Sequence, residues 1–347
     1  MPVDSLSRDL LHWYDGNARA LPWRHPPGCT QTPDPYRVWL AEIMLQQTTV
    51  AAAGPYWERF LARWPTVEAL AAADDAEVMR EWAGLGYYAR ARNLLAAARI
   101  VAQSGTFPAN EVTLRALPGV GAYTAAAIAA IAFGEQATVV DANIERLATR
   151  LFAIATPLPA AKAQIRAALT SHVPADRPGD FAQAMMDLGA TICTPRSPRC
   201  LACPLRAQCT GQRQSNPQAY PVKAAKRDRP VKQGMAWWIE HGGAVALVRR
   251  PPRGLLGGMT ALPGTDWATD QAFHTPFAAD WAVMDDAVSH GFTHFELRLS
   301  IARTTIADPL DRIGDQAIIW TSLDALPQAG LPTLYTRAAR AVLELAS

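Results

Sequence analysis

Residues 113–133 read TLRALPGVGAYTAAAIAAIAF and predict two helices that are joined by a tight turn. A short apolar helix ends at Leu117, the run PGVG follows at 118–121, and a second apolar helix then begins. Glycine allows a tight turn and lets the backbone approach a ligand closely. The free N–H groups at the start of the second helix form an anion-binding site. The stretch therefore predicts a turn that holds an anionic group against backbone amides.

Two glycines of this turn, Gly119 and Gly121, are candidates for contacting DNA. The pattern LPGVG between two helices is typical of a helix-hairpin-helix element, which binds DNA phosphates without reading the base sequence. An ordinary turn between two helices that happens to be rich in glycine is the alternative.

The composition is that of a folded protein with more than one domain. The chain has 347 residues, more than one compact core usually takes, and 50% of them are hydrophobic and 18% charged. The net charge is +2, so any basic surface must be local. The N-terminus has no apolar core of the signal-peptide type, and the longest apolar run, 125–133, is too short to span a bilayer. We expect a soluble, cytoplasmic protein that does not bind membranes.

Residues 1–213 predict a mainly α-helical domain, because alanine and leucine are dense and apolar residues recur every three to four positions. Asp34-Pro35 predicts a helix start, with aspartate at the N-cap and proline at the first helical position. Asp180 predicts a second helix start of the same kind. Residues 214–233 are polar and interrupted by proline, and we expect them to form a linker.

Residues 234–347 predict a smaller α+β domain. MAWWIE and GAVALVRR are typical of strands on either side of a glycine turn, and FELRLSIAR alternates apolar and polar residues as a half-buried strand does. LPTLYTRAARAVLEL closes the chain as a predicted helix.

Four of the five cysteines fall within seventeen residues, with the spacing C-x6-C-x2-C-x5-C. They are Cys193, Cys200, Cys203 and Cys209. In a reducing compartment, such a cluster indicates a metal site rather than disulfides. Thiolates bind a tetrahedral zinc ion or an iron–sulfur cluster, and the spacing does not decide between the two. Either site is structural, because four protein ligands leave no open position.

Two carboxylates stand out as candidates for acid–base chemistry. Glu42 lies in VWLAEIMLQQ, where its helical neighbours are Val38, Trp39 and Leu45. A lone acid in an apolar stripe is desolvated, which raises its pKa and lets it act as a general acid. Asp141 precedes ANIER and predicts an N-cap, but a cap carboxylate that faces a cleft can also stabilise a cation. A protonated acid paired with an ionised carboxylate is the arrangement that breaks glycosidic bonds. With a DNA-binding hairpin, this pair predicts that a base is cut from its sugar.

The first 213 residues resemble the helix-hairpin-helix DNA glycosylases of the endonuclease III superfamily, and within it the adenine DNA glycosylases of the MutY type. The matching segments are LPWR (21–24), VWLAEIMLQQTTV (38–50), GLGYYARARNL (84–94), LPGVGAYTAAAI (117–128), VVDANIERLATR (139–150), FAQAMMDLGATIC (181–193) and the cysteine quartet. The resemblance implies a monomeric enzyme of base excision repair that removes adenine mispaired with 8-oxoguanine or guanine in double-stranded DNA. It also implies that the loop 193–209 holds a [4Fe–4S] cluster.

The resemblance assigns the chemical steps residue by residue. Glu42 matches the acid that protonates adenine at N7, and Asp141 matches the carboxylate that stabilises the sugar cation, with Asn143 as a helper beside it. Tyr123 stands where lyase-competent relatives carry a nucleophilic lysine, so no Schiff base with the sugar is expected and the enzyme should be monofunctional. A glycosylase fold that binds DNA without chemistry is the alternative, and the intact pair of carboxylates argues against it.

Further matching positions are expected to contact the DNA. Gln47 and Thr48 match residues that contact the opposite 8-oxoguanine, and Tyr88 matches an aromatic residue that wedges into the base stack. The positions that match residues around the flipped adenine are Arg19, Trp23 and Asp187.

The second domain resembles the Nudix-like domain by which this family recognises 8-oxoguanine. Residues 234–347 contain no glutamate-rich Nudix box, so metal-dependent pyrophosphate hydrolysis is not expected. GFTHFEL (291–297) resembles the segment that contacts the lesion and assigns contacts to Phe292, Thr293 and His294. The family usually has serine at the middle position, and threonine keeps the hydroxyl but stiffens the side chain. An ordinary entry into a strand is the alternative.

Overall fold

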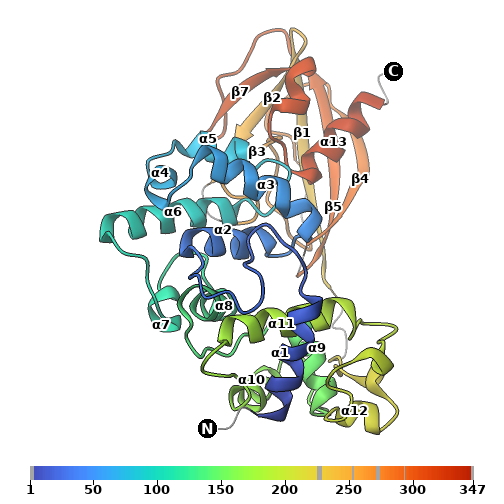
Figure 1. Ribbon diagram of the computed structural model, residues 1–347. Coiled ribbons are helices and arrows are strands. Elements are labelled where there is room, and N and C mark those ends of the chain that lie inside the picture. Colours follow the sequence, from blue (N-terminus) through green and yellow to red (C-terminus); the bar gives the residue numbers. More distant parts are fainter. Residues whose placement is uncertain (1–3, 225–228, 252–253, 271–273, 293, 345–347) are drawn as a thin grey trace. The chain divides into compact units, whose positions relative to one another are not determined.

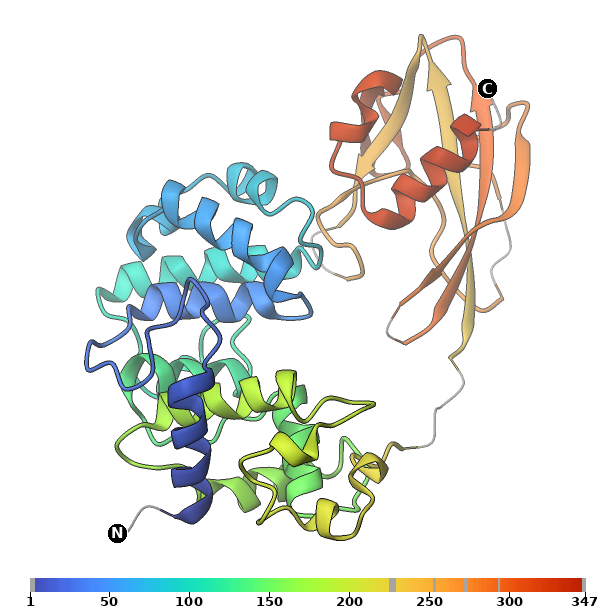
Figure 2. The same cartoon turned by 45° about the vertical axis from the view of Figure 1, so that its right-hand side comes forward.

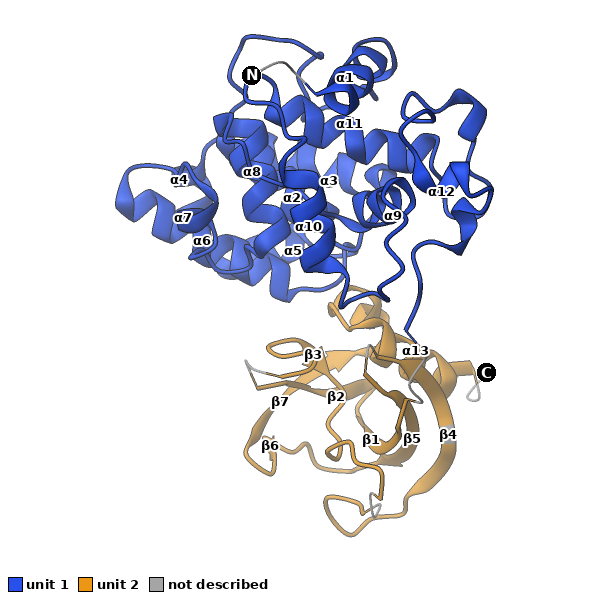
Figure 3. Ribbon diagram, turned by 90° about the horizontal axis from the view of Figure 1, so that it is seen from below, with its two compact units in different colours: residues 1–226 blue, residues 227–347 orange. Residues whose placement is uncertain are grey.

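The computed structural model describes residues 4–224, 229–251, 254–270, 274–292 and 294–344. The chain divides into two compact units, residues 1–226 and 227–347 (Figure 3). The point of division lies within the predicted linker, 214–233, whose last residues already belong to the first strand of the second unit. No helix in these described ranges is both long and apolar enough to cross a membrane.

The first unit is a helical domain with two lobes. Its helices are α1 (Ser5–Asn17), α2 (Pro35–Leu45), α3 (Val50–Arg63), α4 (Val67–Ala71), α5 (Asp75–Glu81), α6 (Ala89–Ser104), α7 (Glu111–Leu114), α8 (Ala122–Phe133), α9 (Ala142–Leu151), α10 (Lys162–Thr170), α11 (Pro178–Thr191) and α12 (Thr210–Arg213), with 3-10 turns η1 (Cys200–Ala202) and η2 (Pro217–Ala219). Helices α2–α6 gather in one lobe, and α1 and α9–α12 gather in the other (Figures 1 and 2). Helix α8 packs against α2 of one lobe and α11 of the other.

Small residues let the central helices approach closely. Helix α8 is rich in alanine and almost wholly buried, so it can pack on two sides. On α11, a Cβ added at Gly179 would come within 2.8 Å of the carbonyl oxygen of Ala130. A larger residue there would push α11 away from α8, so this glycine helps to hold the two lobes together.

Two predicted helix starts have different outcomes. Asp34 caps α2 as predicted, because its carboxylate accepts a hydrogen bond from the Tyr36 amide at 2.9 Å. The prediction for Asp180 is wrong: α11 begins two residues earlier, at Pro178, which suits the first helical position. Asp180 instead lies in the first turn and accepts hydrogen bonds from the Arg177 guanidinium at 2.8 Å and the Gly28 amide at 2.9 Å.

The second unit is built on one mixed sheet. Its elements are β1 (Val231–His241), β2 (Ala244–Arg249), β3 (Thr260–Ala261), β4 (Ala282–Gly291), β5 (Glu296–Thr305), β6 (Arg312–Ile313), β7 (Gln316–Ser322), the 3-10 turn η3 (Leu323–Gln328) and α13 (Thr333–Glu344). The strand order is β4-β5-β1-β2-β7-β6, with β3 paired to β2. Strands β1 and β5 run parallel and the other pairs are antiparallel. The strands and closing helix predicted from the sequence are confirmed.

Both faces of this sheet are covered, and neighbouring tryptophans mark the two sides. Trp238 belongs to the core under α13, whereas Trp237 belongs to a separate core on the opposite face. Successive residues of a strand point to opposite faces, which explains why the run MAWWIE is apolar without a gap. Figure 1 shows α13 lying across the sheet.

Candidate active site

A cavity of about 590 Å³ lies in the first unit, where α2 faces α8–α11. Its wall is built from these helices and from the segment between α1 and α2. The predicted functional residues that line it are Arg19, Trp23, Glu42, Gln47, Thr48, Tyr123, Asp141 and Asn143. The fold therefore brings together side chains that lie up to 124 positions apart in the sequence, from Arg19 to Asn143 (143 − 19).

Glu42 is buried in the cavity wall, with 5% of the residue exposed. It lies in the middle of α2, among neighbours that are themselves buried, as the apolar stripe predicts. Its carboxylate accepts a hydrogen bond from the Tyr123 hydroxyl at 2.7 Å. Burial raises the pKa of Glu42, and it raises the pKa of the Tyr123 phenol well above its ordinary value. The phenol therefore stays protonated and remains the donor.

Asp141 is the N-cap of α9, as predicted. One carboxylate oxygen accepts from the Ile144 amide at 2.6 Å, and the other accepts from the Asn143 side-chain amide at 3.1 Å. Burial raises the pKa of Asp141, and these hydrogen bonds act in the opposite direction because they stabilise the charged form. The N-terminus of α9 also favours a negative charge at this position.

The two carboxyl groups hold their protons unequally. Each negative charge disfavours the other, since the charge of Asp141 raises the pKa of Glu42. Glu42 accepts one side-chain hydrogen bond, whereas Asp141 is stabilised by amide donors and by the nearby Arg146 guanidinium. Arg24 also stabilises the charged form of Glu42, but Asp141 has more hydrogen-bond donors, so its charged form is the better stabilised of the two.

Arg146 fixes the orientation of Asn143. Its guanidinium donates to the Asn143 side-chain oxygen at 3.0 Å, to the Gly189 carbonyl at 2.6 Å and to the Cys193 carbonyl at 2.8 Å. With its oxygen held by Arg146, Asn143 must present its NH₂ group to Asp141. The start of α9 is thus tied both to α11 and to the first cysteine of the loop.

Asp187 does not line the cavity, although it was predicted to lie around the adenine. It is fully buried and accepts from Arg19 at 2.6 and 2.9 Å and from Arg24 at 2.8 and 2.9 Å. Its carboxylate holds both guanidinium groups at the wall of the cavity, where Arg24 lowers the pKa of Glu42. Asp187 is therefore a positioning residue.

Sequence reasoning missed several polar residues of the cavity wall. They are Arg24, Gln46, Glu145, Lys162 and Gln183. Arg24 ends the LPWR motif, and Glu145 follows Asp141 by one helical turn. Both could therefore have been predicted from the sequence. Gln46 directly precedes the predicted Gln47 at the end of α2, whereas Lys162 and Gln183 are brought to the cavity by the packing of α10 and α11.

Two exposed turns of the same unit carry the residues predicted to probe the duplex. Gln47 is exposed and has a positive φ of 56°, and Thr48 follows it. In the second turn, Tyr88 is half-buried against the core, whereas Tyr87 is 60% exposed with a φ of 48°. Arg90 joins the turns, since it donates to backbone carbonyls at the end of α2 at 2.9 and 3.0 Å and before α6 at 3.0 and 3.2 Å.

The hairpin turn lies between α7 and α8, and both of its glycines are exposed. Gly119 has a φ of 76°, and a Cβ there would come within 2.8 Å of the Asn93 side chain. Gly121 caps α8 with a φ of −83°, which any residue adopts. Glycine is therefore required at Gly119 for two reasons, whereas Gly121 leaves the amides of α8 uncovered.

The four cysteines of the loop line one small cavity of about 30 Å³. The buried Arg150 guanidinium donates toward the Cys193 sulfur at 3.3 Å and to the Thr194 carbonyl at 2.7 Å. Burial, with smaller contributions from the other three cysteines, raises the pKa of the Cys203 thiol to about 12. Four cysteines around one small cavity beside a guanidinium supply the donor atoms for a group held by four thiolates. Among the residues that the structure describes, no three His, Cys, Asp or Glu side chains form a group that could hold a metal ion as they stand.

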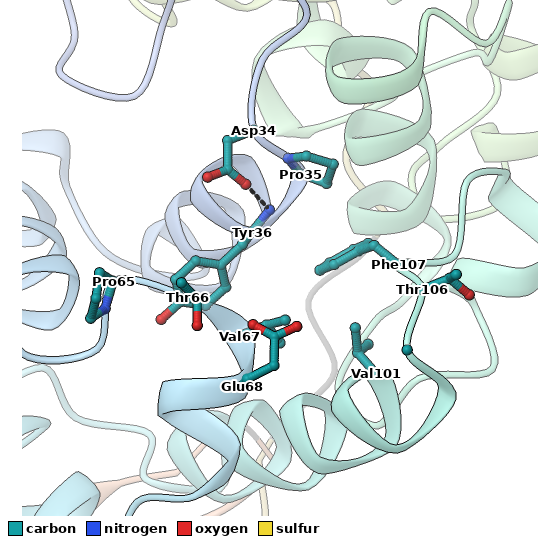
Figure 4. Close-up of a pocket in the computed structure, with 11 residues that line it drawn as sticks. Asp34, Pro35, Tyr36, Pro65, Thr66, Val67, Glu68, Val101, Thr106 and Phe107 are labelled. Carbon is teal, nitrogen blue, oxygen red and sulfur yellow. Dashed lines mark hydrogen bonds between the residues drawn. The ribbon is translucent and has the colours of Figure 1, made fainter.

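A second cavity, of about 220 Å³, lies at the start of α2 (Figure 4). The Asp34 carboxylate points to the Tyr36 amide as its helix cap, and the Tyr36 hydroxyl donates to the Trp64 carbonyl at 2.9 Å. Asp34 and Tyr36 are thus engaged in holding the fold, and no residue predicted as functional is among those that line this cavity.

The predicted lesion-contacting segment lies in the second unit, between β4 and β5. The Phe292 ring packs against Phe295 at 4.8 Å and Trp267 at 5.4 Å, measured between ring centroids, and its amide donates to the Phe295 carbonyl at 2.9 Å. His294 is exposed in the turn. Thr293 lies outside the described residues. Phe292 therefore anchors the turn, and among its described residues His294 is exposed.

Two family matches agree with this architecture. Residues 40–174 match the family described as HhH-GPD superfamily base excision DNA repair protein, and residues 234–341 match the NUDIX domain. The first match runs from α2 to the residues after α10 and includes Glu42, Tyr123 and Asp141. Fold and site together thus define a protein of this base excision repair superfamily with an added Nudix-like domain.

Comparison with individual relatives identifies the family within this superfamily. The adenine DNA glycosylase of Homo sapiens is 36% identical over 317 residues, which are 76% of this chain and 58% of the relative. The adenine DNA glycosylase of Buchnera aphidicola subsp. Schizaphis graminum is 32% identical over 244 residues, 69% of this chain and 68% of the relative. This chain belongs to the adenine DNA glycosylase family. It spans less than two thirds of the length of the human relative.

A solved structure supports the fold of the first unit. The structure of a thermostable thymine-DNA glycosylase superposes with a TM-score of 0.54 and 31% identity, covering 60% of this chain and 95% of that one.

Proposed function

We propose that this protein is a monofunctional DNA glycosylase of base excision repair, which hydrolyses the N-glycosidic bond of adenine mispaired with 8-oxoguanine or guanine in double-stranded DNA. The observation that carries the proposal is the pair Glu42 and Asp141 in one cavity, with Glu42 buried in the middle of α2 and Asp141 held by amide donors at the start of α9. Membership of the adenine DNA glycosylase family supports the choice of base.

The pair defines the order of the reaction. The adenine leaves the base stack and enters the cavity, which costs a few kcal/mol, and the cost is lower for a mispaired base. Glu42 gives its proton to N7 and so turns adenine into a leaving group, while the Tyr123 hydroxyl stabilises the carboxylate that remains. The C1′–N9 bond breaks, and Asp141, oriented by Asn143, opposes the positive charge on the sugar. Water then adds at C1′ and leaves an abasic site.

The exposed turns hold the duplex in this proposal. The amides beyond Gly119 and Gly121 bind a phosphate, and Gln47 and Thr48 contact the base opposite the adenine. We assign the wedge to Tyr87 rather than to the predicted Tyr88, because Tyr87 is the exposed ring and Tyr88 packs against the core.

Recognition of 8-oxoguanine is assigned to the segment Phe292–His294 of the second unit. The aromatic packing of Phe292 holds the turn, and the exposed His294 is free to contact the lesion. A contact from Thr293 is proposed from the resemblance alone. Replacing His294 by alanine should lower adenine release opposite 8-oxoguanine more than release opposite guanine. An equal loss of the rate of adenine release with both duplexes would contradict this assignment.

We infer that Cys193, Cys200, Cys203 and Cys209 hold a [4Fe–4S] cluster. When bound, such a group would fix the loop by four thiolate bonds and would leave no open position for catalysis. Purified protein should show visible absorption with matching iron and sulfide content. A colourless protein that contains zinc would contradict the inference.

We also propose that the enzyme acts as a monomer in the cytoplasm. Mass determination in solution and fractionation of cells test these two points.

The decisive experiment is single-turnover adenine release from a duplex with one 8-oxoguanine:adenine pair. Wild type should release adenine, and Glu42→Gln should lose about 10²–10⁴-fold or more of the rate, the usual contribution of a general acid. Glu58→Gln, an exposed glutamate on α3, removes the same charge outside the cavity and should retain the wild-type rate. A wild type that binds the duplex without releasing adenine would overturn the proposed function.

A further inference from the structure

A further cavity of the first unit, of about 480 Å³, lies next to the candidate active-site cavity. We call it the adjoining cavity. Its wall is built from the segment 23–33, the end of α8 and the start of α11. Within the described part of the chain, four residues line both cavities: Trp23, Arg24, Ile131 and Gln183. These side chains therefore form a shared wall between the site of the proposed reaction and a second space.

The two cavities reach the surface at different residues. The exposed members of the wall of the candidate active-site cavity include Gln47 and Ala142, whereas those of the adjoining cavity include Cys29, Thr30 and Gln31. In the proposed complex, Gln47 contacts the base opposite the adenine, so the duplex covers the first opening. The proposed function assigns no contact with the duplex to the segment that carries the second opening. This second opening therefore stays accessible while DNA is bound.

The lining of the adjoining cavity suits a free purine base. Its volume lies within the range of about 300–1,000 Å³ that is usual for small-molecule sites. Trp23, Ile131 and Phe133 offer apolar surface for a flat ring, and the hydroxyls of Thr30 and Thr32 can both donate and accept hydrogen bonds. A free purine is flat and neutral, and it carries donors and acceptors along its edge. The cavity thus matches the chemistry of the base that the proposed reaction sets free.

Gln183 is the member of the shared wall that is free to turn. It is only 6% exposed, yet no other described residue forms a hydrogen bond with its side-chain amide. Arg24, by contrast, is held by Asp187 at 2.8 and 2.9 Å, and Trp23 packs edge-on against Trp57 with 5.8 Å between ring centroids. A buried amide without a partner is costly, so a polar ligand beside it is stabilised. Gln183 can hydrogen-bond a base on either side of the wall without breaking an existing hydrogen bond.

We propose that the adjoining cavity binds the freed adenine and is the route by which it leaves while the duplex still covers the first opening. The source of the free base rests on the proposed function. Once the C1′–N9 bond is broken, the sugar stays in the duplex and the adenine is no longer attached to it. Gln183 turns, the base passes into the adjoining cavity, and it reaches solvent at residues 28–32.

The test blocks the second opening reversibly at Cys29, an exposed cysteine that lines it. Benzyl methanethiosulfonate attaches a bulky group to the thiol through a mixed disulfide, and dithiothreitol removes it. The full-length protein is then mixed, under single-turnover conditions, with a duplex that carries labelled adenine opposite 8-oxoguanine. Quenched samples give the total adenine cleaved. Rapid filtration through a membrane that retains protein and DNA gives the adenine that has left the complex.

In untreated wild type, adenine should appear in the filtrate as fast as it is cleaved and before the duplex dissociates. The block at Cys29 should leave cleavage unchanged, because Cys29 does not line the cavity that holds Glu42. It should slow the appearance of adenine in the filtrate by about tenfold or more, since the duplex closes the other opening. Dithiothreitol should restore the wild-type rate. Cys29→Ser treated with the same reagent is the matched control, because it keeps the cysteines of the loop 193–209, and it should behave as untreated wild type.

The proposal is overturned if untreated wild type retains cleaved adenine until the duplex dissociates, or if the block leaves the release of adenine unchanged. A second measurement does not depend on cleavage. Free 2-aminopurine, a fluorescent purine, is mixed with the protein bound to a duplex that carries a tetrahydrofuran abasic analogue opposite 8-oxoguanine. The probe should bind, and the block at Cys29 should slow its binding; no binding, or binding that the block does not change, would also overturn the proposal. A protein that binds the probe in this way but cleaves no adenine would refute the proposed function and leave the purine site standing.

Discussion

The hydrogen bond between Tyr123 and Glu42 predicts a shift in the pH dependence of the reaction. The phenol donates to the carboxylate at 2.7 Å, and this bond lowers the pKa of Glu42 against the larger effect of burial. Tyr123→Phe removes the donor and leaves the ring in place. The carboxylate then loses stabilisation that the carboxylic acid does not lose, so the pKa of Glu42 must rise.

The size of the shift follows from the bond that is lost. A hydrogen bond to a charged group contributes about 1.5–3 kcal/mol, and one pKa unit corresponds to about 1.4 kcal/mol. The pKa of Glu42 should therefore rise by about 1–2 units. The enzyme needs Glu42 protonated, so the rate falls as the pH rises through this pKa. In the variant, that alkaline fall should lie at a pH higher by the same amount.

Single-turnover rates of adenine release, measured across the pH range with both proteins, give the two alkaline limbs directly. Tyr36→Phe is the matched control, because Tyr36 is also buried and donates its hydroxyl to a backbone carbonyl outside this cavity. Its alkaline limb should coincide with that of wild type. If the limb of Tyr123→Phe stays in place or moves to lower pH, the group that titrates is not a Glu42 carboxylate stabilised by this phenol.

Three further substitutions test other parts of the structure. Because burial raises the pKa of Glu42 in the folded state, its contribution to stability is present below the unfolded pKa of about 4.3 and is lost as the pH rises. The melting temperature of Glu42→Gln relative to wild type should therefore increase from pH 4 to pH 8. A difference in melting temperature that stays constant over this range would contradict the burial argument. Asp187→Asn removes the carboxylate of a buried ion pair with Arg24 and of a half-buried one with Arg19. Breaking a buried pair costs about 3–5 kcal/mol, so the melting temperature of a unit of this size should fall by roughly 6–20 °C. A melting temperature within 2 °C of wild type, about the effect of 1 kcal/mol, would show that Asp187 is dispensable. Gly119→Ala places a Cβ on a residue with a left-handed backbone, 2.8 Å from the Asn93 side chain, and so distorts the turn. The affinity for duplex DNA, measured by fluorescence anisotropy, should fall. An unchanged affinity would show that this turn does not contact the phosphate.

The features that the sequence could predict are those set by neighbours along one helix. The burial of Glu42 follows from apolar residues one turn before and after it. The cap at Asp141 follows from the helix that begins directly after it. Strands β1 and β2 follow from their apolar runs on either side of a glycine turn, and β5 follows from the alternation in its sequence. In each case the contacts that determine the structure are made by residues close together in the sequence, so the sequence pattern is enough to predict them.

The features that could not be predicted depend on residues far apart in the chain. Arg24 reaches the cavity because Asp187, which is 163 positions away (187 − 24), holds its guanidinium. Arg90 ties together the turns at Gln47 and Tyr87 through backbone carbonyls, which carry no sequence signal. The choice between Tyr87 and Tyr88 depends on a left-handed backbone at Tyr87, which a pair of adjacent tyrosines does not reveal.

The same division explains how two similar acids acquire opposite protonation states. Glu42 lies in the middle of a helix, where the backbone amides are already bonded within the helix and only a side chain can stabilise its charge. Asp141 lies at a helix N-terminus, where free amides and the helix dipole favour the charged form. Desolvation raises the pKa of both acids, yet only at Asp141 do backbone donors oppose that rise. The position of each carboxylate along its helix therefore decides which one gives the proton and which one faces the cation, before any contact with DNA is made.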